Sequence, residues 1–412
     1  MRVLQVNRSD LIGQRFNGFN LADRFEARGV EPRYLVWEKQ TDDSRVARML
    51  PYPGSRRFAR VAHRLETEFS RHAELPLHSH ALPLHSVFRG ADVVHYHIIH
   101  DGYFSLLSLP QLTRQKPSVW TWHDPWPMTG HCIYPLGCER WKIGCGECPD
   151  LTLHFPMQQD RTREAAAMKR RVVTSSDVDI VLASRYMLDM ARNSFVGANA
   201  RLHHIPFGID LEVYRQRDRA ACRARFGVPE ENVVIALRSS SSTFKGLPEM
   251  LAAFEALETS QPITIIGFQE YGHFNRFIGR HQIVELGWVD DDALMVDALS
   301  AADLFLMPSK AEAFGMMAAE AMACAKPVIV FEGTSLPEVV FAPEAGIAVP
   351  MGDAHGLMRA IQLLVDQPEE RRRRGALSRK LAEQHYSLDT YADRLVALYA
   401  EVAARRSGRG QA

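Results

Sequence analysis

The segment Asp303-Leu-Phe-Leu-Met-Pro-Ser-Lys-Ala-Glu-Ala-Phe-Gly315 carries the clearest structural signal in the chain. Its apolar run predicts a buried strand, the proline after it opens a turn, and residues 316–323 predict a helix. A diphosphate binds favourably at the free N–H groups that begin a helix, here those of Phe314, Gly315 and Met316. Because glycine has no side chain, the backbone can approach a phosphate closely. We therefore expect a ligand site where this strand ends.

Two glutamates flank the start of this predicted helix. Glu312 lies just before the helix and Glu320 about two turns into it. A carboxylate accepts hydrogen bonds from paired hydroxyl groups, so one suits a sugar ring and the other a ribose. The alternative is a glutamate favoured by the helix dipole and an ordinary surface glutamate. The strand-turn-helix setting favours a site for a nucleoside diphosphate sugar.

Outside this segment, short β-branched runs alternate with stretches of helical periodicity, as in parallel sheets crossed by helices. In 412 residues this predicts an α/β protein with two doubly wound, Rossmann-like domains. We expect strands at residues 2–6, 32–36, 93–97, 118–122, 179–183, 202–205, 233–237, 263–266, 283–286, 304–307, 328–331 and 346–349. We expect helices at residues 16–27, 103–109, 161–172, 185–193 and 386–404.

Pro206-Phe-Gly-Ile-Asp210 is the predicted domain boundary, because a proline and a glycine separate two strand–helix series. The expected parts are a first domain at 1–206 with a cysteine-rich insertion at 125–156, a second domain at 207–385, and a last helix at 386–404. Residues 405–412 are expected to be disordered.

Two cations are expected beside the glutamates. Arg238 ends a predicted strand, and Lys245-Gly246 opens the next helix. Positive side chains there would neutralise a diphosphate leaving group as its charge grows. The alternative is a serine-rich surface turn with a solvated lysine.

His123 follows another predicted strand, in the sequence Thr-Trp-His-Asp. A histidine there can hydrogen-bond a donor sugar and align an acceptor. The alternative is a structural histidine, which is the role we expect for His95, His97 and His100.

Glu312-x7-Glu320, followed by Lys326-Pro-Val-Ile, resembles the signature of the retaining glycosyltransferases of family 4. The resemblance implies the GT-B fold, in which two such domains face a central cleft. It implies an acceptor-side first domain, a nucleotide-sugar-binding second domain, and a last helix that crosses back. It also implies that Arg238 and Lys245 bind the donor phosphates, that His123 is the catalytic-site histidine, and that the chemistry needs no metal. The expected reaction moves a sugar from a nucleoside diphosphate sugar to a hydroxyl of a growing, lipid-linked bacterial polysaccharide. The expected partners are therefore the nucleotide sugar and a lipid-linked or saccharide acceptor. A GT-B epimerase or phosphorylase and a non-catalytic sugar-nucleotide-binding partner are the alternatives.

Four of the six cysteines lie in the insertion, at Cys132, Cys138, Cys145 and Cys148. The Cys-x-x-Cys pair has the spacing of half a zinc knuckle, so we predict a structural zinc bound by these four thiolates, with His131 as a competing ligand. The alternative is four reduced thiols, or an occasional disulfide, in an irregular loop. The insertion resembles a subgroup that makes bacterial exopolysaccharides of the colanic-acid type.

The chain has 49 basic and 49 acidic residues, so its net charge does not favour nucleic acid. We see no signal peptide or spanning segment and expect a cytoplasmic protein. Residues 44–71 are rich in arginine, with apolar residues between them. This segment is interpreted either as an anionic-membrane contact, giving peripheral attachment, or as a solvated basic helix.

Overall fold

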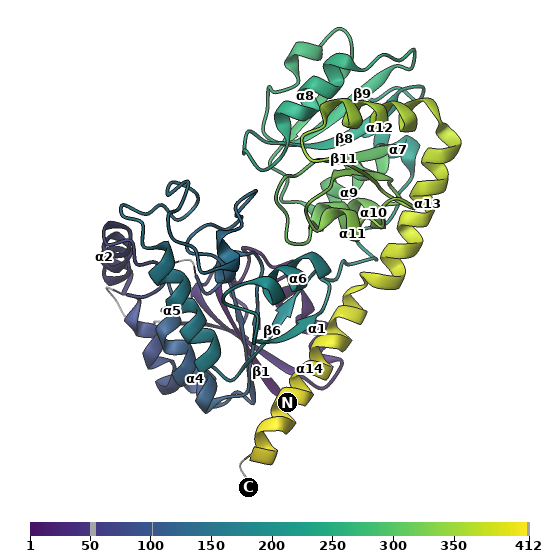
Figure 1. Cartoon of the computed structure of the whole chain (residues 1–412). Helices are drawn as coiled ribbons and strands as arrows, with labels where there is room; N and C mark the ends of the chain where they lie inside the picture. The colour runs from purple at the N-terminus through teal and green to yellow at the C-terminus, as the bar shows by residue number, and fades with distance from the viewer. Residues whose placement is uncertain (50–54, 101, 410–412) are drawn as a thin grey trace. The chain divides into compact units, whose positions relative to one another are not determined.

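The computed structural model describes residues 1–49, 55–100 and 102–409, with side chains described outside 55–59 and 407–409. The chain divides into two compact units. The first consists of Met1–Pro206 with Tyr391–Ala412, and the second of Phe207–Thr390. Each unit is a parallel β-sheet with helices packed on it (Figure 1).

The sheet of the first unit has the strand order β3-β2-β1-β4-β5-β6-β7, and every neighbouring pair is parallel. Its strands are β1 (Arg2–Ser9), β2 (Glu31–Glu38), β3 (Val46–Arg48), β4 (Val93–His97), β5 (Ser118–Thr121), β6 (Val178–Leu182) and β7 (Arg201–His204). Its helices are α1 (Ala22–Glu26), α2 (Ser55–Glu68), α3 (Ser86–Arg89), α4 (Leu109–Gln115), α5 (Thr162–Ser175), α6 (Arg185–Asn193) and most of α14 (Leu388–Arg409).

The sheet of the second unit has the order β10-β9-β8-β11-β12-β13 and is also parallel. Its strands are β8 (Val233–Ser239), β9 (Ile263–Gln269), β10 (Gln282–Gly287), β11 (Leu304–Met307), β12 (Val328–Phe331) and β13 (Ile347–Val349). Its helices are α7 (Arg219–Arg225), α8 (Leu247–Ala256), α9 (Asp292–Ala301), α10 (Met316–Ala323), α11 (Leu336–Val339), α12 (Ala354–Asp366) and α13 (Pro368–His385). Short 3-10 segments complete the chain at Phe19–Leu21, Leu77–Leu84, Leu106–Ser108, Trp126–Met128, Arg140–Lys142 and Asn275–Phe277.

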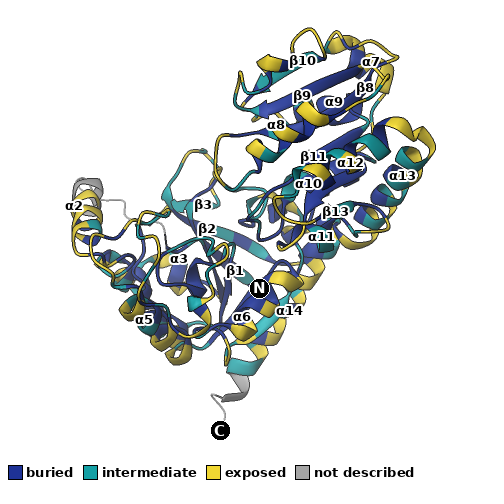
Figure 2. Ribbon diagram, turned by 45° about the horizontal axis from the view of Figure 1, so that its top comes forward, coloured by how far each residue is buried: buried dark blue, intermediate teal, exposed yellow. Residues whose placement is uncertain are grey.

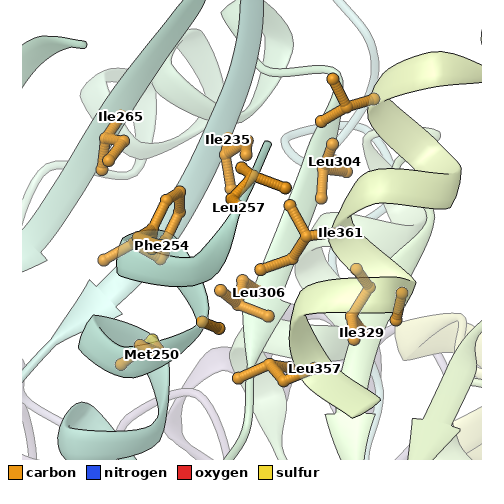
Figure 3. Close-up of a cluster of buried hydrophobic side chains, with 14 of the residues drawn as sticks. Ile235, Met250, Phe254, Leu257, Ile265, Leu304, Leu306, Ile329, Leu357 and Ile361 are labelled. Carbon is orange, nitrogen blue, oxygen red and sulfur yellow. The ribbon is translucent and has the colours of Figure 1, made fainter. Parts of the chain in front are cut away.

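The core of the second unit shows why its strands are continuous apolar runs. Helices cover both faces of a doubly wound sheet, so central strands such as β11 are buried along their whole length. On one face, Phe254 of α8 and Ile361 of α12 belong to the same buried cluster as Leu306 (Figure 3). Figure 2 shows the central strands buried, whereas the outer faces of helices such as α13 are exposed.

The two predicted doubly wound sheets are present, and the predicted strands match observed strands to within three residues at either end. The short edge strand β3 was not predicted. The prediction of a helix at 103–109 is wrong, because α4 begins at Leu109, where Pro110 occupies the first turn that proline favours. The predicted helix at 16–27 is limited to a 3-10 turn and the short α1.

The prediction of a disordered tail is wrong for residues 405–409, because α14 continues to Arg409. Arg405 Nη1 lies 2.7 Å from Asp179 Oδ2 on the buried strand β6, and Arg406 Nη1 donates to the carbonyl of Thr113 at 2.9 Å. These contacts hold the end of the helix against the first unit. Residues 410–412 lie outside the described part of the chain.

Candidate functional site

The candidate donor site of the second unit lies where β8 and β11 are adjacent. The order β9-β8-β11-β12 reverses between these two strands, and ligands of doubly wound sheets bind at the carboxyl edge of such a switch point. Arg238 is near the end of β8, and Glu312 lies in the turn after β11. The tertiary structure thus gathers predicted site residues that are far apart in the sequence.

Lys245 and Glu312 form an ion pair, with 2.5 Å between Nζ and Oε1. The side chains of Lys245 and Glu312 are only 15% and 12% exposed, so the pair is largely removed from water. Burial lowers the pKa of Lys245, the charge of Glu312 opposes this shift, and the positive charge of Arg238 adds to it. The two predicted donor-site cations therefore act on each other, and an anion placed beside them would relieve their repulsion.

Gln269 and Glu270, which the sequence did not predict as site residues, hold Arg238 and the loop after it in place. The Nε of Arg238 donates to Oε1 of Gln269, which ends β9 with a positive φ of 87°. Glu270 accepts hydrogen bonds from the hydroxyl of Ser240 at 3.1 Å and the backbone N–H of Ser241 at 2.8 Å. No local pattern marks Gln269 or Glu270, because their partners lie about 30 residues away along the chain.

The turn before α10 lies where the sequence predicted it. Gly315 caps α10 with φ 98°, a left-handed conformation that favours glycine, and Met316 begins the helix. Phe314 is buried, with ring contacts to Phe207 and Tyr386. The hydroxyl of Ser335 bonds to the carbonyls of Glu312 and Phe314 at 3.1 and 3.0 Å, which fixes the turn from the neighbouring element.

Glu320 lies on α10 as predicted, but its side chain is completely buried. The ribose-binding role of Glu320 rests on the sequence motif and stays a prediction.

His123 follows β5 in the first unit, whereas Arg238, Lys245 and Glu312 belong to the second. It is half-buried, its ring centroid is 5.0 Å from that of Phe16, and its Nε2 is 3.0 Å from Nδ1 of His97. Burial lowers the pKa of His123 to about 3, so its ring is neutral at physiological pH. Nε2 of His100 lies 3.3 Å from Oδ2 of Asp124, and its ring stacks on Trp126. The structural role expected for His100 stays a prediction.

The four cysteines of the insertion line one small cavity of about 20 Å³ and are free thiols. Thiolates are favoured zinc ligands, but within residues 1–49, 55–100 and 102–409 no three His, Cys, Asp or Glu side chains are placed to hold a metal ion. The loop is instead held by Lys169, a buried residue whose Nζ donates to the carbonyls of Trp126 and Thr129 at 2.8 and 2.9 Å. Zinc binding by Cys132, Cys138, Cys145 and Cys148 stays a prediction.

Metal analysis of protein purified without chelator tests the zinc prediction. We expect one zinc per chain, lost when Cys145 and Cys148 are both replaced by serine, because thiolates carry most of the binding energy. Replacement of the buried Cys222 and Cys324 is the control and should leave the zinc content unchanged. A wild-type protein without bound metal would leave Lys169 as the element that orders the loop.

Two protein-family models match the chain. The family described as Glycosyltransferase Family 4 matches residues 19–213, and Glycosyl transferases group 1 matches residues 218–381. The chain belongs to these glycosyltransferases, and its two α/β units have the GT-B fold, as the resemblance implied.

One curated relative is the putative colanic acid biosynthesis glycosyl transferase WcaC of Escherichia coli K12, which is 29% identical over 264 residues. This match covers 61% of the chain and 62% of the relative, so the chain spans less than two thirds of that protein. Among solved structures, sucrose-phosphate synthase from Thermosynechococcus elongatus has a TM-score of 0.70 at 18% identity, over 98% of this chain and 100% of that one. Anabaena Alr3699/HepE in complex with UDP-glucose has a TM-score of 0.64 at 15% identity, over 97% and 100% of the two chains.

Proposed function

We propose that this chain transfers a glycosyl group from a nucleoside diphosphate sugar to a hydroxyl of a bacterial polysaccharide precursor. The observation that carries the proposal is the buried Lys245–Glu312 pair beside Arg238, at the switch point of the second sheet. A diphosphate is the ligand whose charge fits two such cations and the start of a helix. The relationship to the colanic acid protein supports an exopolysaccharide role.

In the proposed reaction, the anomeric configuration is retained. Lys245, Arg238 and the N-terminus of α10 stabilise the negative charge that grows on the departing diphosphate. As Lys245 turns to the phosphate, Glu312 is released to accept hydrogen bonds from the donor sugar. Glu320 holds the ribose, and His123 of the first unit aligns the reacting groups. The cations supply the electrostatic stabilisation, so the proposed chemical step needs no metal.

A nucleotide-release assay tests this function. The donors are UDP-glucose, chosen because a related structure contains it, and a panel of other nucleotide sugars, each with and without saccharide or lipid-linked acceptors. We expect nucleotide release that depends on the acceptor and yields a glycoside. Release without acceptor would favour an epimerase, phosphate-dependent release a phosphorylase, and binding without turnover a non-catalytic partner. Each of these three results would refute the proposed transfer.

A lipid-linked acceptor would be met at an anionic membrane surface, for which α2 is the proposed contact. Val61 and Leu65 on α2 and Phe69 after it lie four residues apart and are 54%, 38% and 52% exposed, and Arg64 is also exposed. An apolar stripe with basic neighbours is typical of helices that lie on anionic lipid. Residues 50–54 of the predicted segment 44–71, and the side chains of 55–59, lie outside the described part. No helix in the described part of the chain is long and apolar enough to cross a bilayer.

Vesicle co-sedimentation tests this contact. We expect the wild-type protein to bind vesicles with anionic lipid at low salt and to bind neutral vesicles weakly. Replacing Leu65 and Phe69 with aspartate should abolish binding, because charged side chains oppose insertion. Replacing Tyr271 and Ile278, which are exposed in the second unit, is the matched control. Absence of wild-type binding to anionic vesicles at low salt would refute the contact.

A further inference from the structure

A chain of buried polar side chains in the first unit ends at His123. Gln5 on β1, His95 and His97 on β4, and Tyr399 on α14 are each completely buried. His95 and His97 lie two residues apart on one strand, so both point to the same face of the sheet. Buried polar groups are costly unless they are hydrogen-bonded, and these four side chains bond to one another.

The contacts form two branches from one tyrosine. The hydroxyl of Tyr399 is 2.7 Å from Nδ1 of His95, whose Nε2 is 2.7 Å from the hydroxyl of Thr121. On the other branch, Nε2 of Gln5 donates to the same tyrosine hydroxyl at 3.2 Å. Oε1 of Gln5 is 2.8 Å from Nε2 of His97, and Nδ1 of His97 is 3.0 Å from Nε2 of His123.

The number of protons sets the direction of every bond in the second branch. The hydroxyl of Tyr399 accepts from Nε2 of Gln5, which leaves the amide oxygen of Gln5 for His97. Oε1 of Gln5 can only accept, so His97 must carry its proton on Nε2. Burial lowers the pKa of His97 well below its usual range, so the ring is neutral and its Nδ1 has a lone pair. That lone pair accepts the proton on Nε2 of His123.

We propose that His97 is a positioning residue that holds His123 in the Nε2–H tautomer, and that Gln5 and Tyr399 in turn fix His97. The neutral His123 is then left with Nδ1 as its acceptor atom, which suits a hydroxyl group of the sugar donor or acceptor. This last step rests on the proposed function, whereas the tautomer does not. The arrangement also makes α14 part of the support of His123, although Tyr399 is 304 residues from His95 in the sequence.

Nitrogen-15 NMR of the histidine-labelled full chain tests the tautomer directly. His123 is assigned from the signal that disappears in His123→Gln. We expect the wild-type signal of a neutral ring with the proton on Nε2. A proton on Nδ1 in the wild-type protein would overturn the proposal, whether or not the chain has transferase activity.

Variants of the two β4 histidines separate positioning from general stability. His97→Ala removes the acceptor, so we expect a mixture of His123 tautomers and a kcat lowered at least about tenfold. His97→Asn places an amide oxygen near the position of Nδ1 and should restore the tautomer and most of kcat. His95→Ala removes an equally buried ring from the same strand but leaves the Gln5 branch intact, so the His123 tautomer should persist. An unchanged tautomer in His97→Ala, or the same loss in His95→Ala, would contradict the proposal.

If the wild-type protein shows no transfer, the tautomer measurements still decide the role of His97. Conversely, active protein with a freely exchanging His123 tautomer would retain the proposed function and refute the role of His97. The two proposals therefore fail independently.

Discussion

Lys245→Ala should lower kcat/KM with a nucleoside diphosphate sugar by about 100- to 1,000-fold, the usual effect of removing one preorganised charge that stabilises a transition state. The effect should lie mainly in kcat, because the diphosphate gains charge as its bond to the sugar breaks. Steady-state kinetics of nucleotide release measure both parameters. The loss of Lys245 also leaves Glu312 without the cation that lies 2.5 Å away, so the stability of the variant must be compared with a suitable control.

Lys310→Ala is the matched control for this experiment. Lys310 belongs to the turn after β11 that also contains Glu312. It pairs with Glu249 at 2.6 Å, and the two side chains are 27% and 15% exposed. Removal of Lys310 leaves behind the carboxylate of Glu249, which is about as buried as that of Glu312. We assign Lys310 no contact with the donor phosphates. We expect comparable losses of thermal stability in the two variants and near-normal kcat only in Lys310→Ala. Equal kcat values in the two variants would refute the role of Lys245.

Gly246→Ala should be the most damaging single methyl addition at the donor site. Gly246 caps α8 with φ 69°, and a Cβ built there would lie 2.1 Å from the backbone carbonyl oxygen of Pro308. The left-handed conformation and the clash together should cost about 2–5 kcal/mol of unfolding free energy. The turn from Pro308 to Glu312 must move to accept the methyl group, so transfer activity should fall as well.

Gly227→Ala separates the two contributions. Gly227 has a similar φ of 63°, but a Cβ there meets nothing within 4 Å. This variant should lose only the conformational part, about 1–2 kcal/mol, and keep its activity. Thermal and urea unfolding of both variants, followed in the second unit, measure the difference. If Gly246→Ala were no less stable than Gly227→Ala, the close packing of Gly246 against the carbonyl of Pro308 would be refuted.

The sequence predicted the elements of the donor site with few errors. β11 and β12 have the predicted ends, because each is a short apolar run between polar residues and turns. Gly315 and the start of α10 were also predictable, since the conformation of a helix cap depends on adjacent residues. Errors arose where apolar periodicity was weak, at β3, or where a proline displaced the start of a helix, at α4.

The residues that hold the loops of the candidate donor site in place, such as Gln269 and Ser335, could not have been predicted in the same way. Gln269 and Ser335 are polar residues without a local motif, and their importance depends on the loops of neighbouring strands. The structural role expected for His97 also has to be refined, because its contact with His123 follows from the pairing of β4 with β5. A side chain's partner across a sheet is set by strand order, which periodicity does not reveal.

The amino-acid order alone determined the strand–turn–helix units, the placement of charged residues at strand ends and the glutamate motif, because these depend on residues only a few positions apart. Tertiary structure decided which of these groups meet. Lys245 reaches Glu312 across 67 residues, and Tyr399 reaches Gln5 across 394. Such contacts depend on the parallel order of the strands and on the return of α14 to the first unit, both of which require the whole chain to be folded.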